Sequence, residues 1–87
     1  MGNKYSTELP VYTLEQVRES DRMLYILGNK VIDASAVLNK HPGGNDCLYN
    51  KKGTDITSDY KFHNPVAQKH IRELVVGIVI RPKHIYN

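Results

Sequence analysis

The 87-residue chain contains no tryptophan, and Cys47 is its only cysteine. One cysteine cannot form an intramolecular disulfide, so a disulfide-rich secreted fold is excluded and a reducing compartment is favoured. The longest apolar run, residues 74–80, is far shorter than the roughly 18 residues that cross a bilayer, and no signal-peptide pattern is present. We therefore expect a soluble, cytoplasmic protein without a transmembrane anchor.

The composition is that of one small globular domain, with 40% hydrophobic and 24% charged residues. A domain of this size buries only about 60% of the surface that its unfolded chain exposes. Because no disulfide is available, a bound metal or cofactor is a natural source of further stability. We expect a loose segment over residues 1–9, a folded domain over 10–82 and a short tail over 83–87.

The formal net charge of +3 raises the question of a nucleic-acid binder. All of the excess falls within residues 64–87, where four basic residues oppose only Glu73. Basic side chains are not interleaved with aromatic ones, as nucleic-acid-binding surfaces require. The sequence therefore argues against nucleic acid as a partner, and we expect a monomer.

Local signals predict the first half of the fold. Thr13 and Gln16 form a capping-box pattern, which indicates a short helix to about Glu19. Leu24-Tyr25-Ile26-Leu27 and a second segment with Val31 and Ile32 at its centre, residues 30–33, flank Gly28-Asn29. Gly and Asn tolerate the positive φ of tight turns, so this pattern predicts a β-hairpin.

Short helices dominate the second half of the prediction. One or two helical turns are expected over residues 35–39, since Pro42 prevents the helix from continuing. Further helices are expected over 46–51, capped by Asn45 and closed by Gly53, and from Thr54 or Asp55 to about 61. Asn64-Pro65 starts another helix to about residue 73. A β-rich tail over 79–81 follows, with Gly77 as a break. The fold class is therefore α+β, a small mixed sheet with four to six short helices.

Two histidines stand at boundaries of these elements. His41 follows one predicted helix and His63 precedes another, 22 residues later. Apolar residues surround both positions in the sequence. Two imidazoles facing each other across an apolar slot suit a flat iron porphyrin ligated on both faces. Zinc would need four ligands, and no Cys/His spacing supplies them. The alternative is that both histidines are ordinary surface or capping residues.

The motif around these histidines resembles the cytochrome b5 haem-binding domain. His41-Pro42-Gly43-Gly44 is followed by the segment from Gly53 to Thr57 and then by His63, and the resemblance runs from about Tyr12 to Val79. It implies non-covalent haem b with His41 and His63 as the axial ligands. Proline fixes the turn and the glycines let the backbone bend beside the porphyrin. The cofactor-binding residues that the resemblance implies are Leu27, Val37, Leu38, His41, Pro42, Gly43, Cys47, Leu48, Tyr60, His63, Asn64, Ala67, Leu74 and Val75.

Individual residues of the resemblance carry further expectations. Asn64 occupies the position at which the family binds a haem propionate. Tyr60 stands where phenylalanine is usual, so its hydroxyl needs a partner. Cys47 is expected to be a buried free thiol, and no Cys-x-x-Cys-His motif for covalent haem attachment is present. His70 is expected to be a half-buried histidine at the pocket edge, and His84 lies in the tail.

The chain also departs from the family's pattern. The stretch between Asp55-Ile56-Thr57 and His63 is one or two residues shorter than usual, which bears on the orientation of the His63 ring. Many members carry a rim of acidic residues around the haem, and this chain has few acidic residues at the matching positions. Asp46 and Asp59 are opposed by basic residues, namely Lys51, Lys52 and Lys61.

The resemblance implies a soluble b-type cytochrome rather than an enzyme. Ligation by two histidines leaves iron no open site for substrate and favours single-electron transfer, at a potential below that of a His/Met cytochrome. The implied partners are a flavoprotein reductase as donor and a redox protein, oxygenase or desaturase as acceptor. The alternatives are a haem- or ligand-binding adaptor on the same fold and a small basic interaction domain without cofactor.

The N-terminus suggests a modification. Gly2 and Ser6 match the N-myristoylation pattern, but a chance match or a glycine left by cloning is the favoured explanation. One acyl chain would give only marginal, reversible membrane contact.

Overall fold

The computed structural model describes residues 8–40 and 44–81 of the chain. Several sequence predictions fall outside these ranges. They concern the myristoylation pattern at Gly2, the histidine motif at His41, Pro42 and Gly43, and the tail histidine His84. Within the described ranges, no helix is long and apolar enough to cross a membrane.

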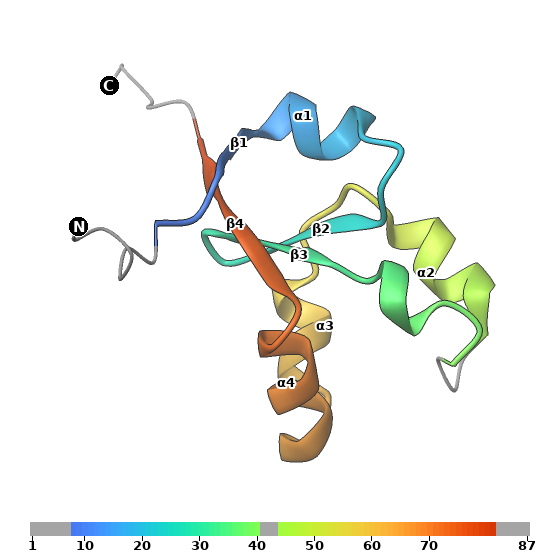
Figure 1. The fold of residues 1–87 in the computed structure, drawn as a ribbon. Coiled ribbons are helices and arrows are strands. Elements are labelled where there is room, and N and C mark those ends of the chain that lie inside the picture. Colours follow the sequence, from blue (N-terminus) through green and yellow to red (C-terminus); the bar gives the residue numbers. More distant parts are fainter. Residues whose placement is uncertain (1–7, 41–43, 82–87) are drawn as a thin grey trace.

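A four-stranded mixed sheet forms the centre of the fold (Figure 1). Its strands are β1 (Val11–Thr13), β2 (Leu24–Leu27), β3 (Lys30–Asp33) and β4 (Val75–Ile80), arranged in the order β1-β4-β3-β2. β1 runs parallel to β4, whereas the other neighbours are antiparallel. The α+β class with a small mixed sheet is confirmed.

The β2–β3 hairpin forms at the predicted turn. Gly28 has a φ of 63°, and Asn29 is not among the residues with positive φ. Only the first of the two turn positions therefore uses the left-handed region, which glycine enters without steric cost. The predicted hairpin is confirmed, but only Gly28, and not Asn29, adopts a positive φ in its turn.

Helix α1 (Leu14–Glu19) begins at the predicted capping box. The Gln16 amide donates to Thr13 Oγ1 at 3.0 Å, and the Thr13 amide donates to Gln16 Oε1 at 2.8 Å. Two amide groups that would otherwise lack partners at the helix start are satisfied in this way. The helix lies across one end of the sheet, and its own Val17 side chain is fully buried.

A 3₁₀ helix, η2 (Ser35–Val37), and α2 (Asn45–Lys51) form the first helical pair. The predicted cap of α2 is wrong, because Gly44 is its N-cap residue, with a φ of 84°. Asn45 lies inside the helix and its side chain bonds backward to Asn39 instead. The Asn45 side chain therefore bonds to Asn39 and does not cap α2.

The second helical pair consists of α3 (Thr57–Lys61) and α4 (Pro65–Arg72). Asn64 Oδ1 accepts the Ala67 amide at 2.8 Å and Pro65 occupies the first helical turn, as predicted. Asp55 Oδ1 accepts both the amide and the hydroxyl of Thr57, at 2.9 and 2.6 Å. Asp55 thus fixes the entry to α3 although it is not the N-cap residue, which is Ile56.

Gly77 was expected to break the C-terminal strand, and this expectation is wrong. β4 is continuous through Gly77, which is buried. A Cβ atom at this position would clash with the ring of Tyr12 and would lie 2.8 Å from the Pro10 carbonyl oxygen. Glycine is therefore required by the close approach of β1 and its tyrosine ring, not by a turn.

The buried residues form two clusters. One contains Val17, Leu24, Ile26, Val31 and Val79, and the other contains Met23, Tyr25, Ile32 and Ala34. Along β2 the members alternate between the clusters, as expected for side chains that point to opposite faces of a strand. The first cluster packs against α1, whereas the second packs against residues of both helical pairs.

Two ion pairs join distant segments around the sheet. Arg22 Nη2 lies 2.9 Å from Asp33 Oδ2, and Arg81 Nη2 lies 3.2 Å from Asp55 Oδ2. Partial burial opposes ionisation of both carboxylates, but hydrogen bonds from Ser35 and Arg22 lower the pKa of Asp33. Hydrogen bonds from Thr57 and Arg81 likewise lower the pKa of Asp55.

Replacing Gly77 with alanine is expected to destabilise the fold by about 1–3 kcal/mol, the usual cost of overpacking. For a domain of this size, each kcal/mol lowers the thermal midpoint by roughly 4–8 °C. Thermal unfolding followed by circular dichroism measures the change. Gly28→Asn is the control, because nothing lies within 4 Å of a Cβ at Gly28 and asparagine tolerates its positive φ. Equal midpoints for Gly77→Ala and the native protein would contradict the packing account.

The lowered pKa values of Asp33 and Asp55 predict acid sensitivity. Their contribution to stability is complete above the unfolded-state pKa, near 4, and is lost as pH falls through the lower folded-state values. The native thermal midpoint should therefore drop between about pH 5 and pH 2. The double variant Asp33→Asn, Asp55→Asn should be less stable at pH 7 and lose less over the same interval. Asp21→Asn, an exposed carboxylate outside both ion pairs, should retain the native acid profile. A double variant as acid-sensitive as the native protein would refute the assignment.

Candidate functional site

His63 occupies the connection between α3 and α4, and its ring is held by the backbone. Nδ1 lies 2.8 Å from the carbonyl oxygen of Asp59. A carbonyl oxygen can only accept, so Nδ1 carries the proton and donates it to this bond. The other ring nitrogen, Nε2, then has a free lone pair. The exposed imidazole of His63 is therefore oriented and in the tautomer that a metal ligand requires.

The turn that carries His63 is fixed by both neighbouring helices. The Asp59 carbonyl also accepts the Phe62 amide at 3.1 Å. The next carbonyl, that of Tyr60, accepts the His63 amide and the Gln68 side-chain amide, each at 3.1 Å. These bonds connect the end of α3 to the first half of α4. The position of the ring therefore depends on the helical hairpin rather than on one side-chain contact.

The segment that contains His41 lies outside the described residues, but both of its ends are described. The Asn39 amide donates to Asn45 Oδ1 at 2.6 Å, and Asn45 Nδ2 donates to Asn39 Oδ1 at 2.8 Å. Asn39 has a φ of 70°, which asparagine tolerates better than most residues. These two bonds hold together the points at which the chain leaves and re-enters the first helical pair.

Six of the predicted pocket residues pack against one hydrophobic cluster. They come from the first helical pair, from β2 and β4 and from the residue just before β4, and all are only partly buried: Leu27, Val37, Leu38, Leu48, Leu74 and Val75. These partly buried aliphatic side chains, together with Ile71 of α4 on the same cluster, offer apolar surface to a flat ligand on one sheet face. Together with the free Nε2 of His63, this surface fits an iron porphyrin.

Three further predicted residues lie on the second helical pair. The Tyr60 hydroxyl accepts a hydrogen bond from Arg72 Nη1 at 2.7 Å, so it has the partner that its phenol requires. Asn64 uses Oδ1 to cap α4, which leaves its Nδ2 group as a donor. Ala67 is partly buried in the first half of α4.

Two expectations about burial are wrong. Cys47 is exposed rather than buried, because Asn45 and Leu48 occupy the inward positions of the short helix α2. His70 is exposed rather than half-buried, because Ala67 and Ile71 take the inward side of α4. In each helix, the next residue along the chain contacts the core instead, Leu48 after Cys47 and Ile71 after His70.

Tyr25 is not among the predicted cofactor-binding residues, yet it packs with the same hydrophobic cluster as they do. Its side chain is buried and its hydroxyl donates to the Leu48 carbonyl. Burial is the main cause that raises its pKa to about 12, so the phenol stays protonated and keeps this bond to α2. Other residues missed at the same surface are Met23, Ile32, Ala34, Ile56 and Ile71. The alternation of residues 23, 25 and 27 could have indicated Met23 and Tyr25, and the spacing of residues 67, 71 and 74 could have indicated Ile71.

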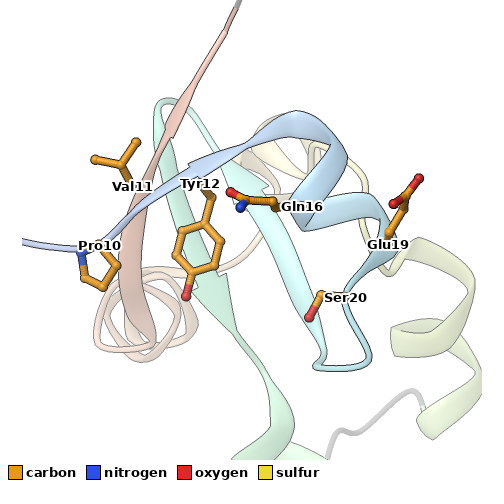
Figure 2. Close-up of a pocket in the computed structure, with 6 residues that line it drawn as sticks. All are labelled: Pro10, Val11, Tyr12, Gln16, Glu19 and Ser20. Atoms are coloured by element: carbon orange, nitrogen blue, oxygen red, sulfur yellow. The ribbon is translucent and has the colours of Figure 1, made fainter.

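A shallow depression elsewhere on the molecule carries no such chemistry. Figure 2 shows it between β1 and α1, lined by Pro10, Val11, Tyr12, Gln16, Glu19 and Ser20. It contains neither histidine nor cysteine, and α1 lies at the opposite end of the molecule from α4 (Figure 1). Within residues 8–40 and 44–81, no group of three or more His, Cys, Asp or Glu side chains is placed to hold a metal ion. The described side chains by themselves therefore supply no all-protein metal centre.

Comparison with known proteins gives consistent matches. Cytochrome b5 of Oryza sativa subsp. japonica is 39% identical over 72 residues, covering 77% of this chain and 53% of that protein. Nitrate reductase [NADH] of Solanum lycopersicum is 32% identical over 79 residues, covering 86% of this chain and 9% of that protein. The chain thus spans less than two thirds of the length of these curated relatives.

A solved structure agrees with the sequence matches. Ectothiorhodospira vacuolata cytochrome b558, described as a prokaryotic homologue of cytochrome b5, superimposes with a TM-score of 0.68 at 25% identity. The match covers 80% of this chain and 98% of that one. The family model for the cytochrome b5-like heme/steroid binding domain matches residues 11–80. The chain therefore belongs to the cytochrome b5-like heme/steroid binding domain family, and its cofactor is haem b held without a covalent bond.

Proposed function

We propose that this domain is a b-type cytochrome that carries single electrons, with His41 and His63 as the two axial ligands of haem iron. The observation that carries the proposal is the bond from His63 Nδ1 to the Asp59 carbonyl at 2.8 Å. It leaves Nε2 free for iron and strengthens the basicity of the ring, as hydrogen bonds to ligand histidines generally do. The paired bonds between Asn39 and Asn45 support the second assignment, because they join the two ends of the segment that contains His41.

The apolar residues have a separate role in this proposal. They exclude water from the cofactor faces and supply dispersion contacts, which lowers the solvent reorganisation that accompanies electron transfer. We assign this role to Leu27, Val37, Leu38, Leu48, Ala67, Leu74 and Val75, with Pro42 and Gly43 beside the ring and Cys47 and Tyr60 at the rim. Asn64 Nδ2 is the proposed donor to a propionate.

Bound haem supplies iron that changes oxidation state by one electron. With an imidazole on each side, no coordination position is open to a substrate, so the domain itself performs no bond-breaking reaction. We propose a flavoprotein reductase as donor and a redox protein, oxygenase or desaturase as acceptor. Monomeric state, cytoplasmic setting and acylation at Gly2 stay predictions, the last to be checked by intact mass after co-expression with a myristoyltransferase.

Visible absorption and electron paramagnetic resonance of haem-reconstituted variants test the ligand assignment. The native protein should give a low-spin spectrum in both oxidation states. His41→Ala and His63→Ala should each become high-spin or lose haem, because one axial bond is removed. His70→Ala is the matched control, an exposed histidine on α4 that should keep the low-spin spectrum.

Each other outcome has a defined meaning. Loss of the low-spin spectrum in His70→Ala with its retention in His63→Ala would show that the wrong histidine was assigned. High-spin haem in the native protein would favour the adaptor alternative. A native protein without a Soret band would favour a basic interaction domain and contradict the proposal.

A further inference from the structure

Two large apolar side chains are exposed at the connection between α3 and α4. Phe62 has 89% of its surface exposed and Val66 has 66%. Both lie within two residues of Asn64, so they belong to the same end of this helical hairpin. An exposed aromatic side chain next to a second apolar one is a feature of protein-contact surfaces more than of ordinary solvent-facing loops.

The charges around these two residues are basic and largely uncompensated. Lys61 and Lys69 are exposed and form no ion pair with any residue in the described ranges. Asp59, the acidic residue nearest to Phe62 in sequence, is engaged by Lys51 Nζ at 2.9 Å, and the exposed Glu73 follows Arg72 beyond the last residue of α4. Arg72 donates to the Tyr60 hydroxyl, a partner that leaves its positive charge in place. The helical hairpin therefore carries two exposed apolar side chains with exposed basic residues as their neighbours in sequence.

This surface adjoins the proposed site of electron exchange. Phe62 immediately precedes His63, and the Phe62 amide shares the Asp59 carbonyl that orients the His63 ring. A protein bound over Phe62 would therefore sit beside an axial ligand. Short separation between redox centres is what a docking surface of an electron carrier must provide.

We propose that Phe62 and Val66, surrounded by Lys61, Lys69 and Arg72, form a docking surface for a redox protein whose own electron-transfer site is ringed by acidic side chains. The proposal rests on the electron-carrier function proposed above. Its chemistry is that of a standard interface, with an apolar anchor at the centre and complementary charge at the rim that steers association. It assigns the partner a charge opposite to that of a basic cytochrome c.

Stopped-flow oxidation of the reduced holoprotein by two acceptors tests the charge preference. The acceptors are an acidic plastocyanin and a basic cytochrome c. The plastocyanin rate should fall by about tenfold or more from low to physiological ionic strength, as expected for steered association, whereas the cytochrome c rate should not fall. A steep fall with cytochrome c and none with plastocyanin would overturn the proposal.

Charge-reversal variants localise the effect. Lys61→Glu combined with Lys69→Glu should reduce the low-salt plastocyanin rate by about tenfold and increase the cytochrome c rate. Arg18→Glu combined with Lys30→Glu changes the net charge equally at exposed positions on α1 and β3, and should shift either rate by less than about twofold. Equal effects of the two double variants would show that only net charge matters and would reject a local surface.

The apolar centre is tested by Phe62→Ala, with Tyr49→Ala as the exposed aromatic control on α2. Phe62→Ala should weaken saturation by plastocyanin about tenfold while the low-spin spectrum and haem retention stay native. If it instead releases haem or alters the spectrum without affecting the plastocyanin reaction, Phe62 belongs to the cofactor pocket and the proposal fails. A native protein without a low-spin spectrum would refute the electron-carrier function itself, whereas a native spectrum with no charge preference would refute only the docking surface.

Discussion

The hydrogen bond between His63 Nδ1 and the Asp59 carbonyl is the constraint on which the site depends. It decides the tautomer of the ring, limits its rotation and leaves one nitrogen for a metal. The bond exists because α3 ends at Lys61, so that the Asp59 carbonyl accepts only the Phe62 amide from the backbone and can also accept the ring of His63. A helix terminus that would otherwise need water or a cap instead orients an imidazole. The shortened connection before His63 therefore does not prevent the ring from being held.

The two faces of the sheet have different roles. One face is closed by α1, with Val17 and Val31 completely buried. The other face supports the two helical pairs, whose inward aliphatic side chains stay partly exposed in the absence of other partners. The buried Tyr25 joins this face to α2 through the Leu48 carbonyl. The domain therefore has one fully buried core and one partly exposed apolar surface that a flat cofactor can cover. A chain of 87 residues can bury only a small core of its own.

Features that depend on neighbouring residues could be predicted from the sequence, whereas those that depend on packing could not. The capping box at Thr13 and the Asn64-Pro65 helix start were correct, since each uses bonds within three or four residues. Gly77 was misread because its reason is the Tyr12 ring, which another strand brings over it. Cys47 was placed on the wrong side because a seven-residue helix has too few positions to define an inward stripe. His41 and His63 were predicted as ligands from their motif and stay a prediction, since His41 lies outside the described residues.

Nitrogen-15 nuclear magnetic resonance of the histidine rings in the reduced, diamagnetic holoprotein tests the central claim most directly. The account predicts that His63 carries a slowly exchanging proton on Nδ1 and none on Nε2, which bonds to iron. His41 should likewise show an Nε2 nitrogen bonded to iron, while His70 should resemble a solvent-exposed imidazole. A proton on Nε2 of His63, or rapid exchange between its two tautomers, would contradict the account.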